Sequence, residues 1–105
     1  MSVVDRVIAA LNAHDVEAFV ACYAADAPIE DGDGTVLARG HDAMRERYGG
    51  IFEEFPAARW RALHRIETGR YVVQHEEVTG RGEATRHVCV YLVEDDLVVR
   101  EQVFR

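Results

Sequence analysis

The sequence is short of the residues that mark disulfide-bonded, zinc-binding or disordered proteins. Its two cysteines, Cys22 and Cys89, lie far apart and form no Cys-X-X-Cys motif, so neither a disulfide scaffold nor a zinc knuckle is indicated. With two prolines and an ordinary hydrophobic content, no stretch has the composition of a linker or a disordered tail. These features favour a folded protein of a reducing compartment, and we expect it in the cytoplasm.

The chain also lacks a long apolar run and an excess of positive charge. Asp5 and Arg6 interrupt the N-terminal segment early, so we expect neither a signal peptide nor a transmembrane helix. The net charge of −7 argues against nucleic acid and anionic membranes as partners. No internal repeat is visible in the 105 residues, and we expect a single domain over residues 1–105.

Hydrophobic periodicity predicts helices in the first half of the chain and strands in the second. The predicted helices span residues 3–13, 16–23 and 42–54, where apolar residues recur at helical spacing. The predicted strands span residues 28–32, 35–38, 59–65, 71–79, 85–93 and 97–104. Helices at the front followed by an antiparallel meander predict an α+β fold.

The segment from Tyr23 to Gly34 holds the first candidate for a catalytic carboxylate. A helical pattern ends at Tyr23, an apolar–polar alternation begins at Pro28, and Gly32 and Gly34 indicate a turn. Asp31 therefore stands at the edge of a half-apolar fold, where burial raises the pKa of a carboxyl group and suits it to accept a proton. The alternative is that Asp31 serves only the turn.

Four short motifs stand out along the chain. They are Leu11-Asn12-Ala13-His14-Asp15, Tyr23-Ala24-Ala25-Asp26-Ala27, Ile29-Glu30-Asp31, and Arg39-Gly40 before an amphipathic helix. Together they resemble the nuclear-transport-factor-2-like superfamily, and the N-terminal half is most similar to ketosteroid isomerases and SnoaL-like polyketide cyclases. The resemblance implies a cone-shaped, curved, mainly antiparallel sheet wrapped around three N-terminal helices, with a pocket. The superfamily hosts several activities and also non-catalytic binding modules, so the resemblance is more specific for fold than for function.

The resemblance implies that Asp31, at the end of its motif, is a general base that takes a proton from a carbon next to a carbonyl group. In the isomerases a tyrosine and a protonated aspartate donate hydrogen bonds to the oxyanion, and these positions fall on Val7 and Cys89. Losing one such donor commonly lowers the rate by about 10²–10³-fold, which argues against efficient steroid isomerisation. Tyr48 could offer a hydroxyl donor instead.

The resemblance also implies which sheet residues line the pocket. They are Val72, Gln74, Glu76, Val78, Thr85, His87, Cys89, Arg100, Gln102 and Phe104. Such a lining would select a small polar ligand, with a carboxylate facing Arg100. The candidate site then comprises Asp31, Tyr48 and His87 as catalytic residues, and Val7, Leu11, Tyr23, Gln74, Glu76, Cys89, Arg100, Gln102 and Phe104 as ligand-binding residues. His87 has the alternative of being a strand histidine with a structural role, and we expect neither a metal nor a cofactor.

The opposite faces of the same strands are apolar, which leaves two interpretations. The apolar residues are Val73, Val88, Val90, Leu92, Val99 and Val103. Either this face is the interface of a homodimer, which we expect, or the alignment is shifted by one residue and the two faces are exchanged.

Three functions remain open at this stage. The first is an isomerase, cyclase or dehydratase that transfers a proton with Asp31 as base. The second is a ligand-binding module without turnover, which the absent oxyanion donors favour. The third is a dimerising protein-interaction domain.

Overall fold

The computed structural model describes all residues, 1–105, and places three helices on one side of a six-stranded sheet. The helices are α1 (Val3–Ala13), α2 (Val16–Val20) and α3 (Gly40–Glu54). The strands are β1 (Pro28–Asp31), β2 (Val36–Arg39), β3 (Arg59–Thr68), β4 (Tyr71–Thr79), β5 (Thr85–Glu94) and β6 (Leu97–Phe104). The predicted α+β class, with three helices and a curved, mainly antiparallel sheet, is confirmed.

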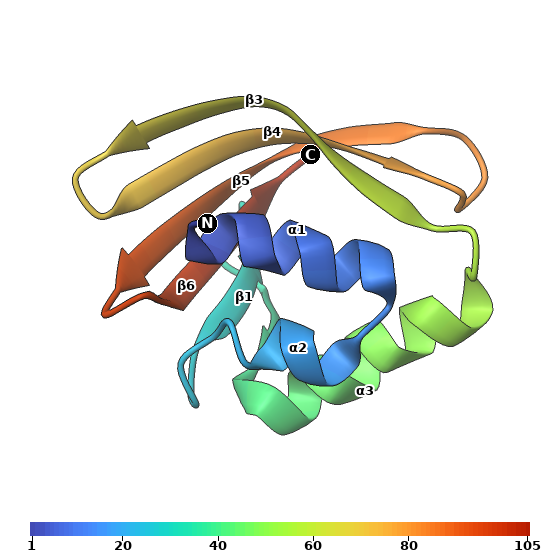
Figure 1. Ribbon diagram of the computed structural model, residues 1–105, viewed down its shortest axis with the longest axis horizontal. Helices are drawn as coiled ribbons and strands as arrows, with labels where there is room; N and C mark the ends of the chain where they lie inside the picture. Colours follow the sequence, from blue (N-terminus) through green and yellow to red (C-terminus); the bar gives the residue numbers. More distant parts are fainter.

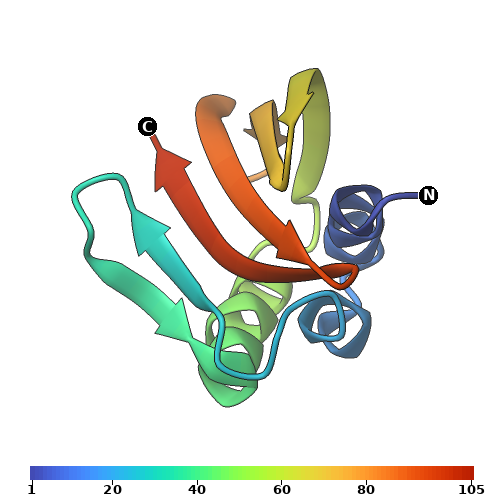
Figure 2. The same ribbon diagram turned by 90° about the vertical axis from the view of Figure 1, so that its left-hand side faces the viewer.

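The strand order β2-β1-β6-β5-β4-β3 brings the first hairpin beside the last strand. All neighbouring strands are antiparallel except β1 and β6, which are parallel. In Figure 1 the strands β3 to β6 arch over α1, while α2 and α3 lie below it. The view in Figure 2 shows that all three helices lie on the concave side of the sheet. Side chains from the concave face therefore point toward the helices.

Local sequence explains where the first two helices begin and end. Ser2 and Asp5 form a capping box at the start of α1, and the Asp15 side chain caps α2. The second helix ends at Val20, earlier than predicted, because the following segment joins the sheet. Tyr23 forms a parallel bridge with Val98 of β6. This bridge turns the tyrosine into the interior, where it is 2% exposed.

A β-bulge in β6 changes which of its residues face the helices. Leu92 of β5 lies opposite Arg100, and the next residue, Val93, lies opposite Val98. Val99 is therefore an extra residue without a partner, and the alternation of side chains shifts by one position beyond it. A second bulge lies in β3, where the pairing with β4 skips Leu63.

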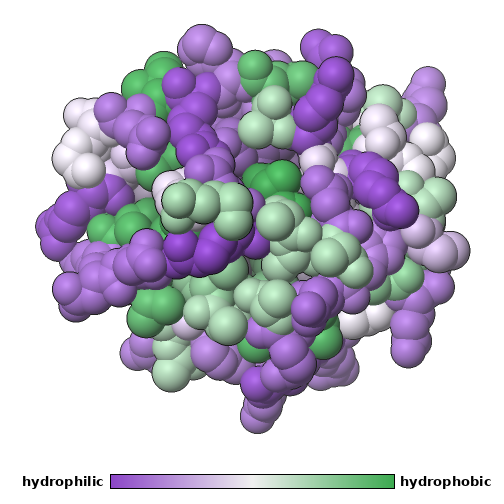
Figure 3. Space-filling model, viewed as in Figure 1, coloured by the Kyte–Doolittle hydropathy of each residue, from purple (hydrophilic) through white to green (hydrophobic).

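The surface of α1 and α2 that is turned away from the sheet carries small side chains. Figure 3 shows pale green, weakly apolar side chains gathered over these helices. They include Ala9, Ala13, Ala18 and Ala21, which line a shallow depression there. No helix has the length and apolar character needed to cross a membrane.

The β4–β5 turn depends on a glycine at position 80. Gly80 has φ +81°, and a Cβ atom there would lie 2.1 Å from the carbonyl oxygen of Ala57. Gly82 in the same turn has φ +97° but nothing within 4 Å of such an atom. We expect Gly80→Ala to lower the free energy of unfolding by about 3 kcal/mol and Gly82→Ala by about 1 kcal/mol. Urea denaturation of the two variants measures the difference, and equal losses would contradict the close contact.

Candidate functional site

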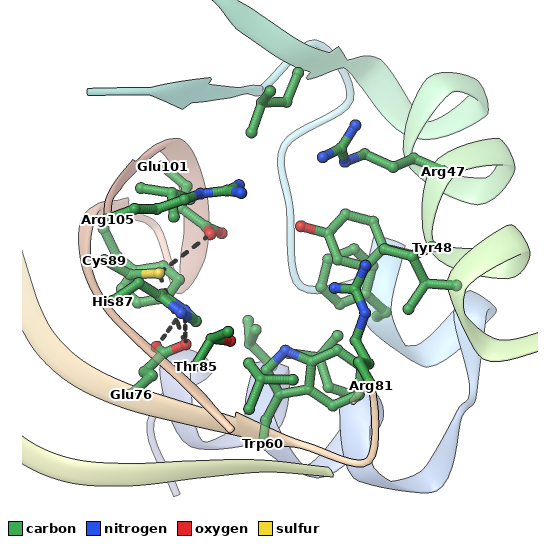
Figure 4. A pocket seen from close by; sticks show the side chains of 18 of the residues that line it. Arg47, Tyr48, Trp60, Glu76, Arg81, Thr85, His87, Cys89, Glu101 and Arg105 are labelled. Atoms are coloured by element: carbon green, nitrogen blue, oxygen red, sulfur yellow. Dashed lines mark hydrogen bonds and ion pairs between the residues drawn. The ribbon is translucent and has the colours of Figure 1, made fainter. Parts of the chain in front are cut away.

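A cavity of about 420 Å³ opens between the helices and the concave face of the sheet. A volume of this order accommodates a small organic molecule. Figure 4 shows Glu76, His87, Cys89 and Glu101 gathered on the sheet side of the cavity. We refer to this group, with Tyr23 and Tyr91, as the floor cluster. Aromatic residues and arginines from the helices and from the β4–β5 turn face it across the cavity.

Glu76 is the centre of the floor cluster and is 1% exposed. The Tyr91 hydroxyl donates to its Oε2 atom at 2.7 Å, and the Gln74 amide donates to the same atom at 2.9 Å. The Nε2 atom of His87 lies 3.2 Å from the Oε1 atom. Burial acts to raise the pKa of Glu76, but the hydrogen bonds from His87, Tyr91 and Gln74 outweigh it and hold this pKa below its ordinary value. Glu76 is therefore the ionised carboxylate of the site.

Glu101 is the second carboxyl group of the floor and is 5% exposed. Burial raises its pKa to about 7, the charge of Glu76 adds to the effect, and hydrogen bonds from Tyr23 and Cys89 oppose it. The Tyr23 hydroxyl donates to its Oε1 atom. Burial also raises the pKa of Tyr23, so its phenol keeps its proton. The pKa of Glu101 lies near neutral pH, where a group can both accept and release a proton.

Cys89 lies between the two carboxyl groups. Its Sγ atom is 3.7 Å from Glu76 Oε1 and 3.6 Å from Glu101 Oε2. Burial raises the pKa of this thiol well above its ordinary value, and the two neighbouring carboxylates raise it further. Cys89 is therefore a protonated hydrogen-bond donor, and a thiolate nucleophile is disfavoured here.

Glu76, His87 and Cys89 are also the residues that could hold a metal ion. Their ligand atoms lie within 4.8 Å of one another and offer the oxygen, nitrogen and sulfur donors that zinc accepts. Hydrogen bonds already link the other two side chains to Glu76. The absence of a metal stays a prediction.

A chain of hydrogen bonds connects the floor cluster to the start of α1. The Gln74 amide donates to Glu76, while its own oxygen accepts from Arg65 Nε at 2.8 Å. The Nη2 atom of Arg65 lies 2.8 Å from Asp5 in the capping box. The bulge at Leu63 places Arg65 on this inner face of β3. The floor therefore holds α1 in place as well as lining the cavity.

Most of the sequence-predicted site residues come together around the cavity. Those that line it are Val7, Leu11, Tyr23, Tyr48, Glu76, His87 and Cys89. Gln74 is fully buried behind Glu76 and bonds to it. Their roles in binding or catalysis stay predictions.

The predicted inner face of the last strand is wrong. Arg100, Gln102 and Phe104 do not line the cavity; Glu101 and Val103 do. Arg100 pairs with Glu30 at 2.8 Å on the outer face, and Phe104 is 41% exposed. The bulge at Val99 is the physical reason, because it shifts the alternation of β6 by one residue. The same shift removes Val103 from the predicted apolar outer face.

Asp31, the predicted base, lies at the rim of the cavity and is not among its lining residues. It pairs in register with Val103, which faces the interior. Its side chain is 34% exposed, and its Oδ1 atom lies 3.7 Å from Nε of Arg105, which does line the cavity.

Sequence reasoning missed Glu101 and the arginines that line the cavity mouth. The missed arginines are Arg47, Arg81, Arg86 and Arg105. Glu101 is the only acidic residue of β6, which could have marked it as a candidate site residue, but simple alternation assigns it to the outer face. Arg47 lies at an exposed helix position, Arg81 lies in a turn, Arg86 is an exposed residue at the start of β5, and Arg105 follows β6. Periodicity does not predict which cavity such exposed residues face.

Comparisons with known proteins agree with this fold. The family described as SnoaL-like domain matches residues 4–101. A cystatin-fold protein from Novosphingobium aromaticivorans is 28% identical, with a TM-score of 0.92 and coverage of 100% of this chain and 99% of its own. A candidate polyketide cyclase from Sinorhizobium meliloti is 19% identical, with a TM-score of 0.84 and coverage of 96% and 92%.

A third structure comes from Catenulispora acidiphila, has a ketosteroid isomerase-like fold and was solved in complex with trimethylamine. It is 14% identical, with a TM-score of 0.85 and coverage of 98% of this chain and 84% of its own. The comparison with curated proteins finds no match.

The raised pKa of Glu101 predicts a specific dependence of stability on pH. The ordinary pKa of this group is 4.5, and in the folded protein it is about 7. Between these two pH values Glu101 keeps a proton in the folded protein that it releases in the unfolded chain. The stabilisation from this proton is complete below the ordinary pKa and is lost as the pH rises through 7. We expect Glu101→Gln to be more stable than wild type by about 2–3 kcal/mol at pH 8, and the difference to shrink toward pH 5.

Urea denaturation at the two pH values measures this effect. Glu67→Gln, which removes an exposed carboxylate from β3, is the matched control. A gain for Glu101→Gln of the same size at both pH values would contradict an unusual titration of Glu101.

Proposed function

Because the chain belongs to the SnoaL-like domain family, we propose that it binds a small organic molecule in its cavity and transfers a proton at a carbon next to a carbonyl group, with Glu101 as the acid–base residue. The family match confirms the resemblance drawn from the sequence motifs. The observation that carries the proposal is the pair of buried carboxyl groups whose pKa values are moved in opposite directions. Such pairs commonly divide the ionised and proton-carrying roles of a catalytic site.

The proposed step uses the ionised form of Glu101. Its carboxylate takes the proton from the carbon, and the electron pair of the broken C–H bond moves toward the carbonyl oxygen to form an enolate. In a substrate with a β,γ double bond the enolate is conjugated with that bond, and returning the proton to the far carbon of the conjugated system isomerises the substrate. The Tyr48 hydroxyl has no hydrogen-bond partner in the protein and points into the cavity (Figure 4). Desolvation and the nearby Glu101 charge raise the pKa of Tyr48, so it remains a donor for the enolate oxygen.

The alternative function is binding without turnover. One observation favours it: no buried side-chain nitrogen or oxygen atom lacks a hydrogen-bond partner. The floor cluster is thus complete without a ligand, as a purely structural polar network would be. The trimethylamine complex of the Catenulispora protein supports small-molecule binding in this fold and is neutral on turnover.

Exchange of α-hydrogen for deuterium, followed by NMR over a panel of ketones and oxo acids, tests the proposed chemistry. For compounds that exchange, we expect the rate to rise with pH through about 7 as Glu101 ionises. Glu101→Gln should lower the rate at least about 100-fold. Asp31→Asn, the matched substitution at the sequence-predicted base, should keep most of it.

A loss in Asp31→Asn with full exchange in Glu101→Gln would transfer the role of base to Asp31. No exchange with any compound that binds would favour the binding module.

We further propose that the outer sheet face joins two copies of the chain. Ile66, Val73 and Val90 lie side by side across β3, β4 and β5, and Val88 pairs with Phe104 of β6. Ile66 is 56% exposed and Phe104 is 41% exposed, so the strip is open to solvent in a single chain. Apolar strips of this kind commonly mark association surfaces.

The expected result is a dimer in sedimentation equilibrium, converted to monomer by Val90→Asp, because burying the new carboxylate in the interface is unfavourable. Ala9→Asp on the exposed side of α1 is the control and should remain dimeric. A monomeric wild-type protein at every accessible concentration would refute this interface.

A further inference from the structure

The charge around the cavity mouth is opposite to that of the whole protein. The chain carries a net charge of −7, and all 12 of its Lys and Arg residues are arginines. Four of them line the cavity, against two carboxyl groups, both at the floor. We propose that the cavity takes an aromatic carboxylate or a similar small anion, whose charged group lies at the mouth between Arg47 and Arg81 and whose other end reaches Glu101. This inference rests on the cavity being the ligand site of the proposed function.

Arg47 and Arg81 differ from most arginines of the chain in having no carboxylate partner. The arginines that do pair with a carboxylate are Arg6, Arg45, Arg61, Arg65, Arg70, Arg86, Arg100 and Arg105. Of the other four, Arg59 donates to backbone carbonyl groups, and Arg39 is exposed at the end of β2. Only Arg47 and Arg81 combine a free guanidinium group with a place in the cavity lining.

The two guanidinium groups reach the mouth from different elements. Arg47 precedes Tyr48 on α3, and Figure 4 shows its guanidinium group directed into the cavity. Arg81 lies in the β4–β5 turn, with its guanidinium carbon 4.8 Å from the ring centroid of Phe55. Stacking holds the plane of a guanidinium group and leaves its N–H edges free to donate. A carboxylate matches these edges with two parallel hydrogen bonds.

The floor of the cavity sets the orientation of such a ligand. Glu76 is ionised, and a second anion beside it would be repelled. At the mouth the same anion meets unpaired arginines. An anionic ligand therefore binds with its charged group outward and its uncharged end against Glu101, where the proposed proton transfer takes place.

The walls between the floor and the mouth favour an aromatic body. Phe19, Tyr48 and Trp60 line the cavity, and the ring centroids of Phe19 and Tyr48 lie 4.4 Å apart. Aromatic side chains contribute apolar area and ring stacking in one surface. With a volume of about 420 Å³, the cavity has room for one or two fused rings carrying a short acidic group.

Calorimetric titration with 2-naphthoate and its uncharged isostere 2-naphthamide tests the proposal without requiring turnover. We expect wild type to bind the carboxylate about tenfold more tightly, as charge-assisted hydrogen bonds at a solvated mouth would provide. The preference should weaken as salt is added, because solvated charges are screened. The variant Arg47→Gln/Arg81→Gln should bind both compounds equally.

Arg70→Gln is the matched control, since it removes the same charge in the β3–β4 turn, at the other end of β4, and should keep the preference. The proposal would be overturned if wild type bound the two compounds equally, or if the preference for the carboxylate survived the double substitution. It would also be overturned if Arg70→Gln abolished the preference as fully as the double substitution does. The outcome is separable from that of the exchange assay. A preference for the carboxylate without any hydrogen exchange supports this inference, while the proposed chemistry fails. Exchange that is limited to uncharged ketones, with no preference for the carboxylate, supports the proposed chemistry, while this inference fails.

Discussion

Burying the charge of Glu76 is the constraint on which the rest of the interior depends. An ionised carboxylate removed from water costs several kcal/mol unless nearby groups hydrogen-bond to it. Here the donors are Gln74 on the same strand and His87, Cys89 and Tyr91 on the next. The three donors on β5 can reach the carboxylate only while β4 and β5 keep their register. A slip of one residue would turn these three donors to the outer face and leave Gln74 as the only donor to the charge.

The same buried charge also acts on Glu101 and on the start of α1. Burial is the main reason that Glu101 keeps its proton to near-neutral pH, and the negative charge of Glu76, two strands away in the sheet, adds to the effect. In the other direction, the amide of Gln74 must point its nitrogen at Glu76, so its oxygen faces Arg65. Arg65 then pairs with Asp5 at the start of α1. One buried carboxylate therefore orders the proton-carrying group, the sheet and the helix that covers it.

Local sequence patterns predicted the helices and strands, and the resemblance to a known superfamily predicted part of the site. Helical periodicity placed α1, whereas apolar alternation alone would have turned the opposite faces of β4 and β5 inward. The resemblance to the superfamily placed Glu76 and His87 on the inner faces of these strands. It failed on β6 because the bulge at Val99 arises from the way two strands meet, which no local pattern in Leu97–Phe104 records. The same limitation applies to the arginines of the mouth. Which cavity an exposed arginine faces is decided by how the helices and turns pack, and periodicity contains no such information.

Cys89 occupies the position that the resemblance assigns to the isomerase aspartate, and a thiol at this position is compatible with the neighbouring Glu76 and Glu101. The sulfur atom of Cys89 lies within 4 Å of both carboxyl groups. A carboxylic acid at that position would be a third acid in a site that already resists a second ionisation, whereas a thiol is small and neutral and donates one weak hydrogen bond. The two carboxyl groups of this site instead lie on β4 and β6, the strands on either side of β5. Chemistry in this cavity therefore has to be derived from its own two glutamates, because the superfamily arrangement cannot be transferred residue by residue.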